Sequence, residues 1–242
     1  MNNPTALITG ASRGLGLALA AGLARAGFDL IIDARDGAVL DAAAGALRAA
    51  DPAAQRPGST AVTAVAGDVT DPEHRAALAA AAAAAGRLDL LVNNAGTLGA
   101  SPLPALADYP VDELRAAFEA NVIAPVALTQ LALPLLRASG GAVLNITSDA
   151  AVEAYTGWGG YGAAKAALEQ ASNVLAAEEL AVRVWWVDPG DLRTDMHQLA
   201  FPGEDISDRP EPDAIVPAFV RLITGRLPSG RYRAAHLLPV TS

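Results

Sequence analysis

A glycine-rich turn near the start of the chain constrains its fold more than any other stretch. Residues 5–9 form a short apolar run, and Gly10, Gly14 and Gly16 follow before apolar residues resume at helical spacing. Glycine lets the backbone approach a ligand closely, and the free N–H groups at a helix start favour a bound phosphate. A strand, a glycine turn and a helix in this order predict a site for a nucleotide pyrophosphate. The spacing Gly-x-x-x-Gly-x-Gly differs from the better known Gly-x-Gly-x-x-Gly.

The rest of the chain alternates between strand-length apolar runs and helical patterns. We expect further strands at 28–32, 61–66, 88–92, 141–146, 182–187 and 232–240, helices at 39–50, 71–85, 114–136, 159–180 and 215–224, and a surface loop at 51–59. This alternation predicts an α/β fold, a single Rossmann-type doubly wound domain of about seven parallel strands flanked by helices on both faces.

The 242 residues suit one domain of this kind. We expect residues 1–100 to form a dinucleotide-binding half and residues 101–242 a catalytic and substrate half. The polar, proline-containing stretch 190–213 is long for a loop in a compact domain, so we interpret it as a lid over the substrate.

Composition narrows the classes of partner. The net charge of −9 argues against a nucleic-acid partner, and the lack of cysteine removes disulfides and thiolate chemistry. Three scattered histidines have no metal-ligand spacing, so we expect no metal site. The longest apolar run, 76–85, is too short for a bilayer, and nothing near Met1 resembles a signal peptide. We expect a cytoplasmic protein with a small-molecule substrate and no membrane partner.

Tyr161 and Lys165 form the strongest candidate for chemistry. Residues four apart on a helix share a face, so the phenol and the ammonium can project into one cavity. A nearby cation favours the phenolate, which predicts a Tyr161 pKa closer to neutral. Lys165 is the only lysine among 17 lysine and arginine residues. Ser148 follows the strand expected at 141–146, and active groups in open α/β sheets gather past the carboxyl ends of strands.

Seven motifs together resemble those of the short-chain dehydrogenase/reductase family of the compact type. In chain order they are Thr9-Gly-Ala-Ser-Arg-Gly-Leu-Gly16, Asp68-Val69, Asn93-Asn-Ala-Gly96, Asn121, Ser148, Tyr161-x-x-x-Lys165 and Pro189-Gly190. The resemblance covers residues 6–194 and implies hydride transfer between a nicotinamide cofactor and a carbonyl or alcohol carbon.

The resemblance also implies roles for single residues. Tyr161 would exchange the proton, Ser148 would bind the carbonyl oxygen, and Lys165 would hold the nicotinamide ribose. Asn121 would hold a water that links Lys165 to solvent, since Pro125 leaves the Asn121 carbonyl without its helical N–H partner. The predicted cofactor-binding residues are Gly10, Ser12, Arg13, Gly14, Leu15, Gly16, Arg35, Asp68, Val69, Asn94, Ala95, Gly96, Tyr161, Lys165, Pro189, Gly190, Leu192 and Thr194.

Cofactor preference depends on the end of the second strand. A carboxylate there selects the free 2′-hydroxyl of NAD(H), whereas an arginine selects the 2′-phosphate of NADP(H). The expected selecting position carries Ala34, and Arg35 follows it. Arg13 adds a second guanidinium. We therefore favour NADP(H), while Asp33 leaves NAD(H) open.

Substrate class rests on the stretches around the catalytic tyrosine. Gly157-Trp158, Glu178-Glu179 and residues 189–198 resemble the sepiapterin reductase branch, which reduces diketone side chains and related dicarbonyls. The tail at 229–234 lacks the aspartate that anchors the pterin ring. We predict a ketone or dicarbonyl reductase, sepiapterin reductase-like or benzil reductase-like. Tyr155, Trp158 and Met196 are candidates for an apolar or aromatic pocket, although ordinary packing also explains each of them.

Other functions remain open from the sequence. One is an NAD-dependent alcohol dehydrogenase of the same family, and another is a non-catalytic nucleotide-sensing regulator, against which the intact Ser148, Tyr161 and Lys165 count. Sugar-nucleotide epimerases share the Tyr-x-x-x-Lys pair but resemble longer chains. The family resemblance further implies a homodimer or homotetramer.

Overall fold

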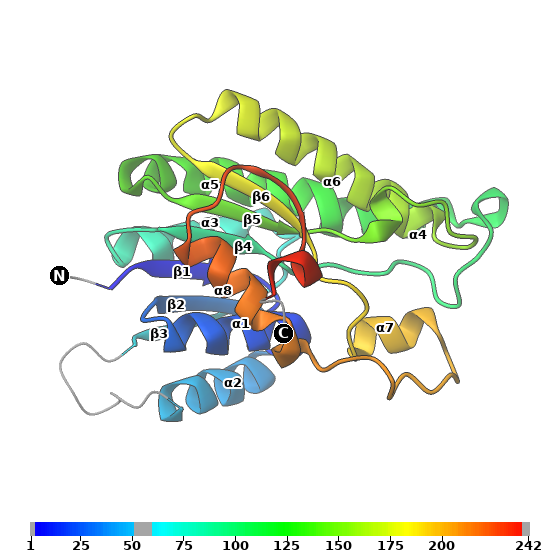
Figure 1. The fold of residues 1–242 in the computed structure, drawn as a ribbon, viewed down its shortest axis with the longest axis horizontal. Helices are drawn as coiled ribbons and strands as arrows, with labels where there is room; N and C mark the ends of the chain where they lie inside the picture. Colours follow the sequence, from blue (N-terminus) through cyan, green and yellow to red (C-terminus); the bar gives the residue numbers. More distant parts are fainter. Residues whose placement is uncertain (1–2, 51–59, 239–242) are drawn as a thin grey trace.

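A seven-stranded parallel sheet forms the centre of the computed structural model, which describes residues 3–50 and 60–238 (Figure 1). The strand order is β3-β2-β1-β4-β5-β6-β7. The strands are β1 (Thr5–Ile8), β2 (Asp29–Ala34), β3 (Val62–Ala66), β4 (Leu90–Asn93), β5 (Ala142–Ile146), β6 (Arg183–Asp188) and β7 (Gly230–Arg233). The predicted fold class is confirmed.

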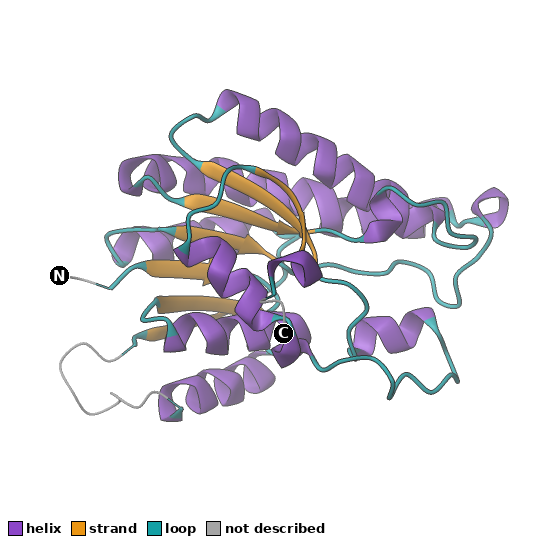
Figure 2. Cartoon of the chain, viewed as in Figure 1, coloured by secondary structure: helices purple, strands orange, loops and turns teal. Residues whose placement is uncertain are grey.

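Helices cover both faces of the sheet (Figure 2). They are α1 (Gly14–Arg25), α2 (Gly37–Ala49), α3 (Pro72–Ala84), α4 (Val111–Phe118), α5 (Ala124–Ser139), α6 (Gly159–Glu178), α7 (Asp195–Ala200) and α8 (Val216–Thr224). Helices α1, α2 and α8 lie on one face and α3, α5 and α6 on the other, with α7 set apart from both layers (Figure 1).

Each face of the sheet has its own hydrophobic core, because successive residues of a strand point to opposite sides. In β1, Ala6 and Ile8 pack in the core under α1 and α8, whereas Leu7 packs in the core under α3 and α5. A strand that is buried on both faces has apolar residues at almost every position. This continuous apolar pattern is the reason that the strands could be predicted from short stretches of the sequence.

The strand order reverses between β1 and β4. From β1 the chain proceeds outward through β2 and β3, and it then returns to β4 on the other side of β1. Ligands of open α/β sheets bind in the crevice past the carboxyl ends of the strands at such a reversal. At this point the N–H of Thr9 donates to the carbonyl of Val92 at 3.0 Å, so the two loops leave the sheet side by side.

Three local features differ from the predictions. The last strand is Gly230–Arg233 and passes into a 3₁₀ turn at Ala234–Leu237, so the strand expected at 232–240 was placed too late. The segment 190–213, predicted to be a loop, contains the short helix α7. The helix predicted at 114–136 is interrupted by a π-helical turn, Glu119–Ile123, between α4 and α5. The loop predicted at 51–59 lies outside the described residues.

The π turn has a cause in the sequence. Pro125 has no N–H to donate to the fourth residue before it, so the regular α pattern cannot continue through this point. The N–H of Ala124 instead donates to the carbonyl of Glu119, five residues back. Single π turns inside α-helices are frequent at functional sites, and Asn121 lies in this one.

The helical stretch Val111–Ser139 is the one helix in the described part of the chain with the length and hydropathy of a membrane span. Its most apolar window has a mean hydropathy of 1.5 and is 33% buried inside the molecule. Leu128, Ala132 and Leu136 pack in the core against β4 and β5. One face of this helical stretch covers the sheet, and other apolar side chains on it, such as Ile123 and Leu131, are exposed.

Candidate active site

Tyr161 and Lys165 lie side by side in the first turns of α6, both almost completely buried. The Lys165 ammonium is 5.4 Å from the centre of the Tyr161 ring, and it donates to the carbonyl of Ile146 at 2.8 Å. Gly162 allows this arrangement, because a Cβ at that position would lie 2.5 Å from the carbonyl oxygen of Ala150. The predicted pair therefore faces the end of β5.

Burial determines the ionisation of this pair. Burial raises the pKa of Tyr161 above its usual value, and the carboxylates of Asp188 and Asp149 raise it further. Burial also lowers the pKa of Lys165 to about 8. The expectation that Lys165 moves the Tyr161 pKa toward neutrality is wrong for this structure, because desolvation of the phenolate dominates. The phenol is therefore protonated at neutral pH.

Ser148 begins a short 3₁₀ turn directly after β5. Its hydroxyl donates to Asp149 at 3.0 Å and accepts from the N–H of Ala150 at 3.2 Å. The same Asp149 carboxylate accepts from the hydroxyl of Tyr155 at 2.9 Å. Asp149 was not predicted as a site residue. In the sequence, only the position of Asp149 next to Ser148 could have indicated a role at the site. Its hydrogen bond with Tyr155 depends on how the loop folds.

Asn121 is buried behind the loop that follows β4. Its side-chain oxygen accepts from the N–H of Thr97 at 3.1 Å, and its amide donates to the Thr97 carbonyl at 2.8 Å. A Cβ at Gly96 would lie 2.4 Å from the Asn121 oxygen and 3.9 Å from the Lys165 ammonium. The structure thus brings Asn121, Gly96 and Lys165 together.

The glycine-rich turn is tied to the loop after β4. Asn94 donates from its side chain to the carbonyls of Thr9 and Gly10 at 2.9 and 3.1 Å, and the N–H groups of Asn94 and Ala95 both donate to the Thr9 hydroxyl at 3.0 Å. Gly16 has no room for a side chain, since a Cβ would lie 2.2 Å from the Gly10 carbonyl oxygen. These contacts fix the start of α1 beside the crevice.

The N-terminus of α1 is suited to a phosphate group. Arg13 at the N-cap makes no capping side-chain bond, and no acidic residue lies in the first turn. Helix N-termini without such partners have N–H groups available for an anion. The residues present therefore fit the pyrophosphate of a dinucleotide.

The carboxylate of Asp33 is buried and engaged by groups within the fold. Its buried carboxylate accepts from the N–H of Gly10 at 2.6 Å and lies 2.9 Å from Nε2 of the buried His74. Burial raises the pKa of Asp33, against the opposing effects of the His74 and Gly10 hydrogen bonds. The Asp33–His74 pair thus holds the glycine turn through the hydrogen bond from the N–H of Gly10. His74 was missed in the sequence analysis, because it stands within an alanine-rich helix without a recognisable motif.

Arg35 and Asp68 remain at the outer part of the crevice. Burial opposes ionisation of Asp68, but hydrogen bonds from Thr70 and the charge of Arg35 hold its pKa below the usual value. Arg35 is exposed, as is Arg13, whose guanidinium forms an ion pair with Asp195 of α7 at 3.0 Å. The guanidinium of Arg13 thus reaches from the glycine turn to the lid segment.

The segment after β6 crosses the same end of the sheet. Asp188 accepts from the N–H of Gly190 at 2.9 Å, Leu192 is buried, and the Thr194 hydroxyl caps α7. A Cβ at Gly14 would lie 3.6 Å from the Thr194 methyl group. Of the predicted residues after β6, Thr194 therefore lies against the glycine turn.

The three predicted pocket residues divide into two groups. Trp158 and Met196 pack in one cluster with Tyr161, and the Trp158 and Tyr161 rings meet edge to face at 5.8 Å. Tyr155 instead lines a hollow of about 340 Å³, which Trp158, Gly162 and Ala150 also border. Neither Ser148 nor Tyr161 lines this hollow.

This arrangement defines a Rossmann-type oxidoreductase: a nucleotide crevice at the strand reversal and, beside it, a buried Tyr-Lys pair. The short-chain dehydrogenase model matches residues 4–205. The chain belongs to the short-chain dehydrogenase/reductase family and is an enzyme that acts on CH–OH and C=O groups.

Similar proteins agree with this assignment. An uncharacterized oxidoreductase of Mycobacterium tuberculosis is 39% identical over 85% of this chain and 76% of its own length. Sepiapterin reductase of Meriones unguiculatus is 38% identical over 80% of this chain and 76% of its own length. A short-chain dehydrogenase of Shigella flexneri, solved in complex with NADP, superimposes with a TM-score of 0.86 at 30% identity and covers 97% of this chain and 98% of that one.

Proposed function

We propose that the protein is an NADP(H)-dependent reductase of ketones or dicarbonyls. The observation that carries the proposal is the buried Tyr161–Lys165 pair at the end of β5, beside the glycine turn. A bound nicotinamide supplies the hydride. Tyr161 delivers a proton to the oxygen of the substrate, Ser148 donates a hydrogen bond to that oxygen, and Lys165 holds the nicotinamide ribose, with Asn121 behind it.

Tyr161 carries the proton that carbonyl reduction requires. A group that protonates a developing alkoxide must carry its proton at the working pH. Burial raises the pKa of Tyr161, which keeps the phenol protonated at neutral pH. Positioned acid–base catalysis contributes about 10²–10⁴-fold. The rest of the rate enhancement must come from holding the substrate and cofactor in attack geometry.

The conformation of Asp33 favours NADP(H) over NAD(H). Its carboxylate is engaged with Gly10 and His74, so it does not select a free 2′-hydroxyl. Arg35 is exposed at the end of β2 and can pair with a 2′-phosphate. The Shigella flexneri relative bound to NADP is in agreement.

A dicarbonyl substrate is supported by the sepiapterin reductase relatives and by the aromatic side chains near Tyr161. The rings of Trp158 and Phe201 pack against each other in the cluster that contains Tyr161, with ring centres 6.1 Å apart. We propose that Trp158 and Met196 contact an apolar part of the substrate and that Tyr155 lies at its outer edge. Segment 190–213 would act as the lid, since α7 is linked to the glycine turn through Asp195 and to the loop after β4 through Leu199 and Ser101.

A spectrophotometric screen tests the proposal. Oxidation of NADPH and NADH is followed with sepiapterin, benzil and simple ketones, for the wild type and for Tyr161→Phe. We expect turnover with NADPH and a dicarbonyl, no turnover by Tyr161→Phe, and unchanged NADPH binding by that variant. Near-full reduction by Tyr161→Phe would contradict the mechanism, and a preference for NADH would contradict the cofactor assignment.

A further inference from the structure

Three consecutive residues at the end of β5 are bonded to side chains from other elements. The Ile146 carbonyl accepts from Lys165 at 2.8 Å, the Thr147 hydroxyl donates to Glu169 at 2.8 Å, and the Ser148 carbonyl accepts from Arg231 at 3.2 Å. The first contact belongs to the site already described. The other two involve Glu169 and Arg231, which have no role in the proposed mechanism.

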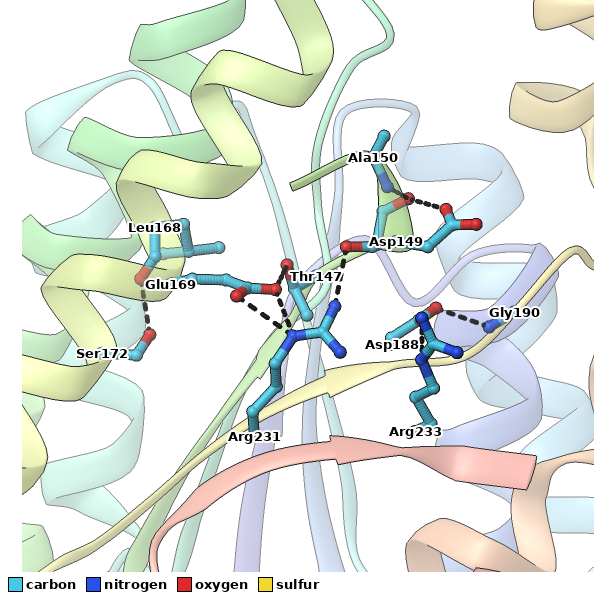
Figure 3. A network of polar contacts seen from close by, with 11 residues as sticks. Thr147, Asp149, Ala150, Leu168, Glu169, Ser172, Asp188, Gly190, Arg231 and Arg233 are labelled. Carbon is cyan, nitrogen blue, oxygen red and sulfur yellow. Dashed lines mark hydrogen bonds and ion pairs between the residues drawn. The ribbon is translucent and has the colours of Figure 1, made fainter. Parts of the chain in front are cut away.

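Glu169 and Arg231 form a partly buried ion pair next to Thr147 (Figure 3). Nε of Arg231 lies 2.9 Å from one Glu169 oxygen and 3.1 Å from the other, and the two side chains are 24% and 12% exposed. Removing such a pair from water costs free energy, which is offset only when further hydrogen bonds satisfy both groups. Here Thr147 and the Ser148 carbonyl supply those bonds.

The pair connects β7 to the two elements that carry the site, α6 and the turn after β5. Glu169 lies four residues after Lys165, so it shares the face of α6 that carries Tyr161 and Lys165. Arg231 lies in β7, opposite Trp186 of β6. The guanidinium reaches from β7 to the carboxylate on α6 and to the carbonyl of Ser148 (Figure 3). The planar guanidinium can bind both acceptors at once, which an ammonium does poorly.

Ser148 needs an external support of this kind. Strand β5 ends at Ile146, and the last backbone bond to a neighbouring strand runs from the N–H of Thr147 to Val187. Beyond that point the carbonyl of Ser148 accepts from the N–H of Ala151, within its own turn, and from Arg231. Arg231 therefore supplies the side-chain hydrogen bond that ties the Ser148 carbonyl to another element, while Ala150 of the same turn packs against Gly162 of α6.

We propose that Arg231 and Glu169 are positioning residues that hold the Ser148 peptide at a fixed place relative to Tyr161. This inference rests on the proposed function, in which Ser148 binds the substrate oxygen. A displacement of about 1 Å in a catalytic group can lower the rate about 10²-fold, so a distant support of this kind is able to affect turnover.

A double-mutant cycle tests the inference. The kcat of the Arg231→Met variant is compared with that of the wild type, and the kcat of the Arg231→Met/Ser148→Ala double variant with that of Ser148→Ala. Arg183→Met is the control, because Arg183 begins the neighbouring strand β6 at the opposite end of the sheet. We expect Arg231→Met to lower kcat by about 10–100-fold with NADPH affinity unchanged. In the Ser148→Ala background it should lower kcat no further, since residues that act through one group are not additive.

A multiplicative loss in the Ser148→Ala background would overturn the inference, because Arg231 would then act through folding or through charge. An equal loss in Arg183→Met, or no loss in Arg231→Met, would overturn it too.

Glu169→Gln separates positioning from electrostatics. The glutamine oxygen can still accept from Thr147 and Arg231, but the negative charge is removed. We expect a smaller loss of kcat than in Arg231→Met and an unchanged pH–rate profile. A loss as large as that of Arg231→Met, with a shifted pH profile, would assign the effect to charge and overturn the inference.

A crystal structure tests the position of Ser148 without a measurement of turnover. The crystal structure of Arg231→Met should show the Ser148 peptide displaced and the β5 strand unchanged, whereas an unmoved Ser148 would overturn the inference. If the wild type reduces no carbonyl in the screen, the proposed function fails, and the crystal structure alone decides whether Arg231 positions Ser148.

Discussion

Lys165 is the residue whose charge most directly affects the site. Burial lowers its pKa to about 8, so the ammonium is present below that pH and is lost above it. Within the described structure, the ammonium of Lys165 donates a hydrogen bond to the Ile146 carbonyl and pairs with no carboxylate. Nothing therefore offsets the effect of burial on its pKa.

The first prediction concerns pH. We expect kcat/KM for carbonyl reduction to be constant below about pH 8 and to fall above it, as Lys165 loses its proton. A pH–rate profile between pH 6 and 9.5 with saturating NADPH measures this. Lys165→Arg would remove the alkaline decline from any residual activity, because arginine stays charged. A flat wild-type profile to pH 9.5 would contradict the prediction.

A second prediction uses two glycines with different surroundings. A Cβ at Gly16 would lie 2.2 Å from the Gly10 carbonyl oxygen, whereas a Cβ at Gly45 in α2 would meet no atom within 4 Å. We expect Gly16→Ala to lower the free energy of unfolding by about 1–3 kcal/mol and to weaken NADPH binding. Gly45→Ala should raise it by about 0.5–1 kcal/mol. Urea unfolding and fluorescence titration measure both. Equal effects of the two variants would refute this account.

At the level of elements, the close contact between α1 and α8 depends on one glycine. A Cβ at Gly22 would lie 2.3 Å from a methyl group of Val216, which begins α8. Phe219 and Leu222 of α8 are fully buried in the same core as Leu19 and Leu23 of α1. The third prediction is that Gly22→Ala destabilises the protein by about 1–3 kcal/mol through overpacking.

A second substitution tests this packing. Val216→Ala removes the methyl group that an alanine at position 22 would strike, so the double variant should be more stable than Gly22→Ala alone. Denaturant unfolding of the four proteins gives the coupling energy. If the double variant is less stable than both single variants, the contact does not limit the packing of these helices.

At the level of the whole molecule, α5 and the π turn leave apolar side chains exposed on the face away from the sheet. Ile123 and Leu131 are 49% and 46% exposed, and Val126 is 36% exposed. Exposed apolar residues that cluster on one helix are typical of an interface. We propose that this face is buried in the homodimer or homotetramer that the family resemblance implies.

The fourth prediction follows from that assembly. We expect light scattering to give at least twice the mass of the chain, and Leu131→Glu to lower the measured mass by placing a charge in the interface. Val39→Glu is the control, because Val39 lies on α2 at the opposite face of the sheet and is similarly exposed. A wild type with the mass of a monomer, or an equal change of mass in both variants, would contradict the proposed interface.

The fold class and the position of most elements follow from local patterns in the amino-acid sequence. Strands β1 to β6 and most helices lie within a few residues of their predicted bounds, because apolar periodicity and glycine or proline signals act locally. The end of the chain was less predictable. A longer strand was predicted at 232–240, but within the described residues Gly230–Arg233 are those that pair with β6. Pairing partners are distant in sequence, so such a boundary depends on the packed sheet.

The tertiary structure decided what surrounds each candidate group. The sequence indicated that Lys165 shifts the Tyr161 pKa downward, whereas burial and two carboxylates brought close by folding raise it. It left Asp33 open for NAD(H), whereas the fold turns that carboxylate toward His74 and Gly10. It contained no signal for Arg231 behind Ser148. Residue spacing predicts which chemical groups share a helix face or a strand end. Desolvation and through-space contacts arise only when distant segments pack together, and these decide the ionisation and orientation of those groups.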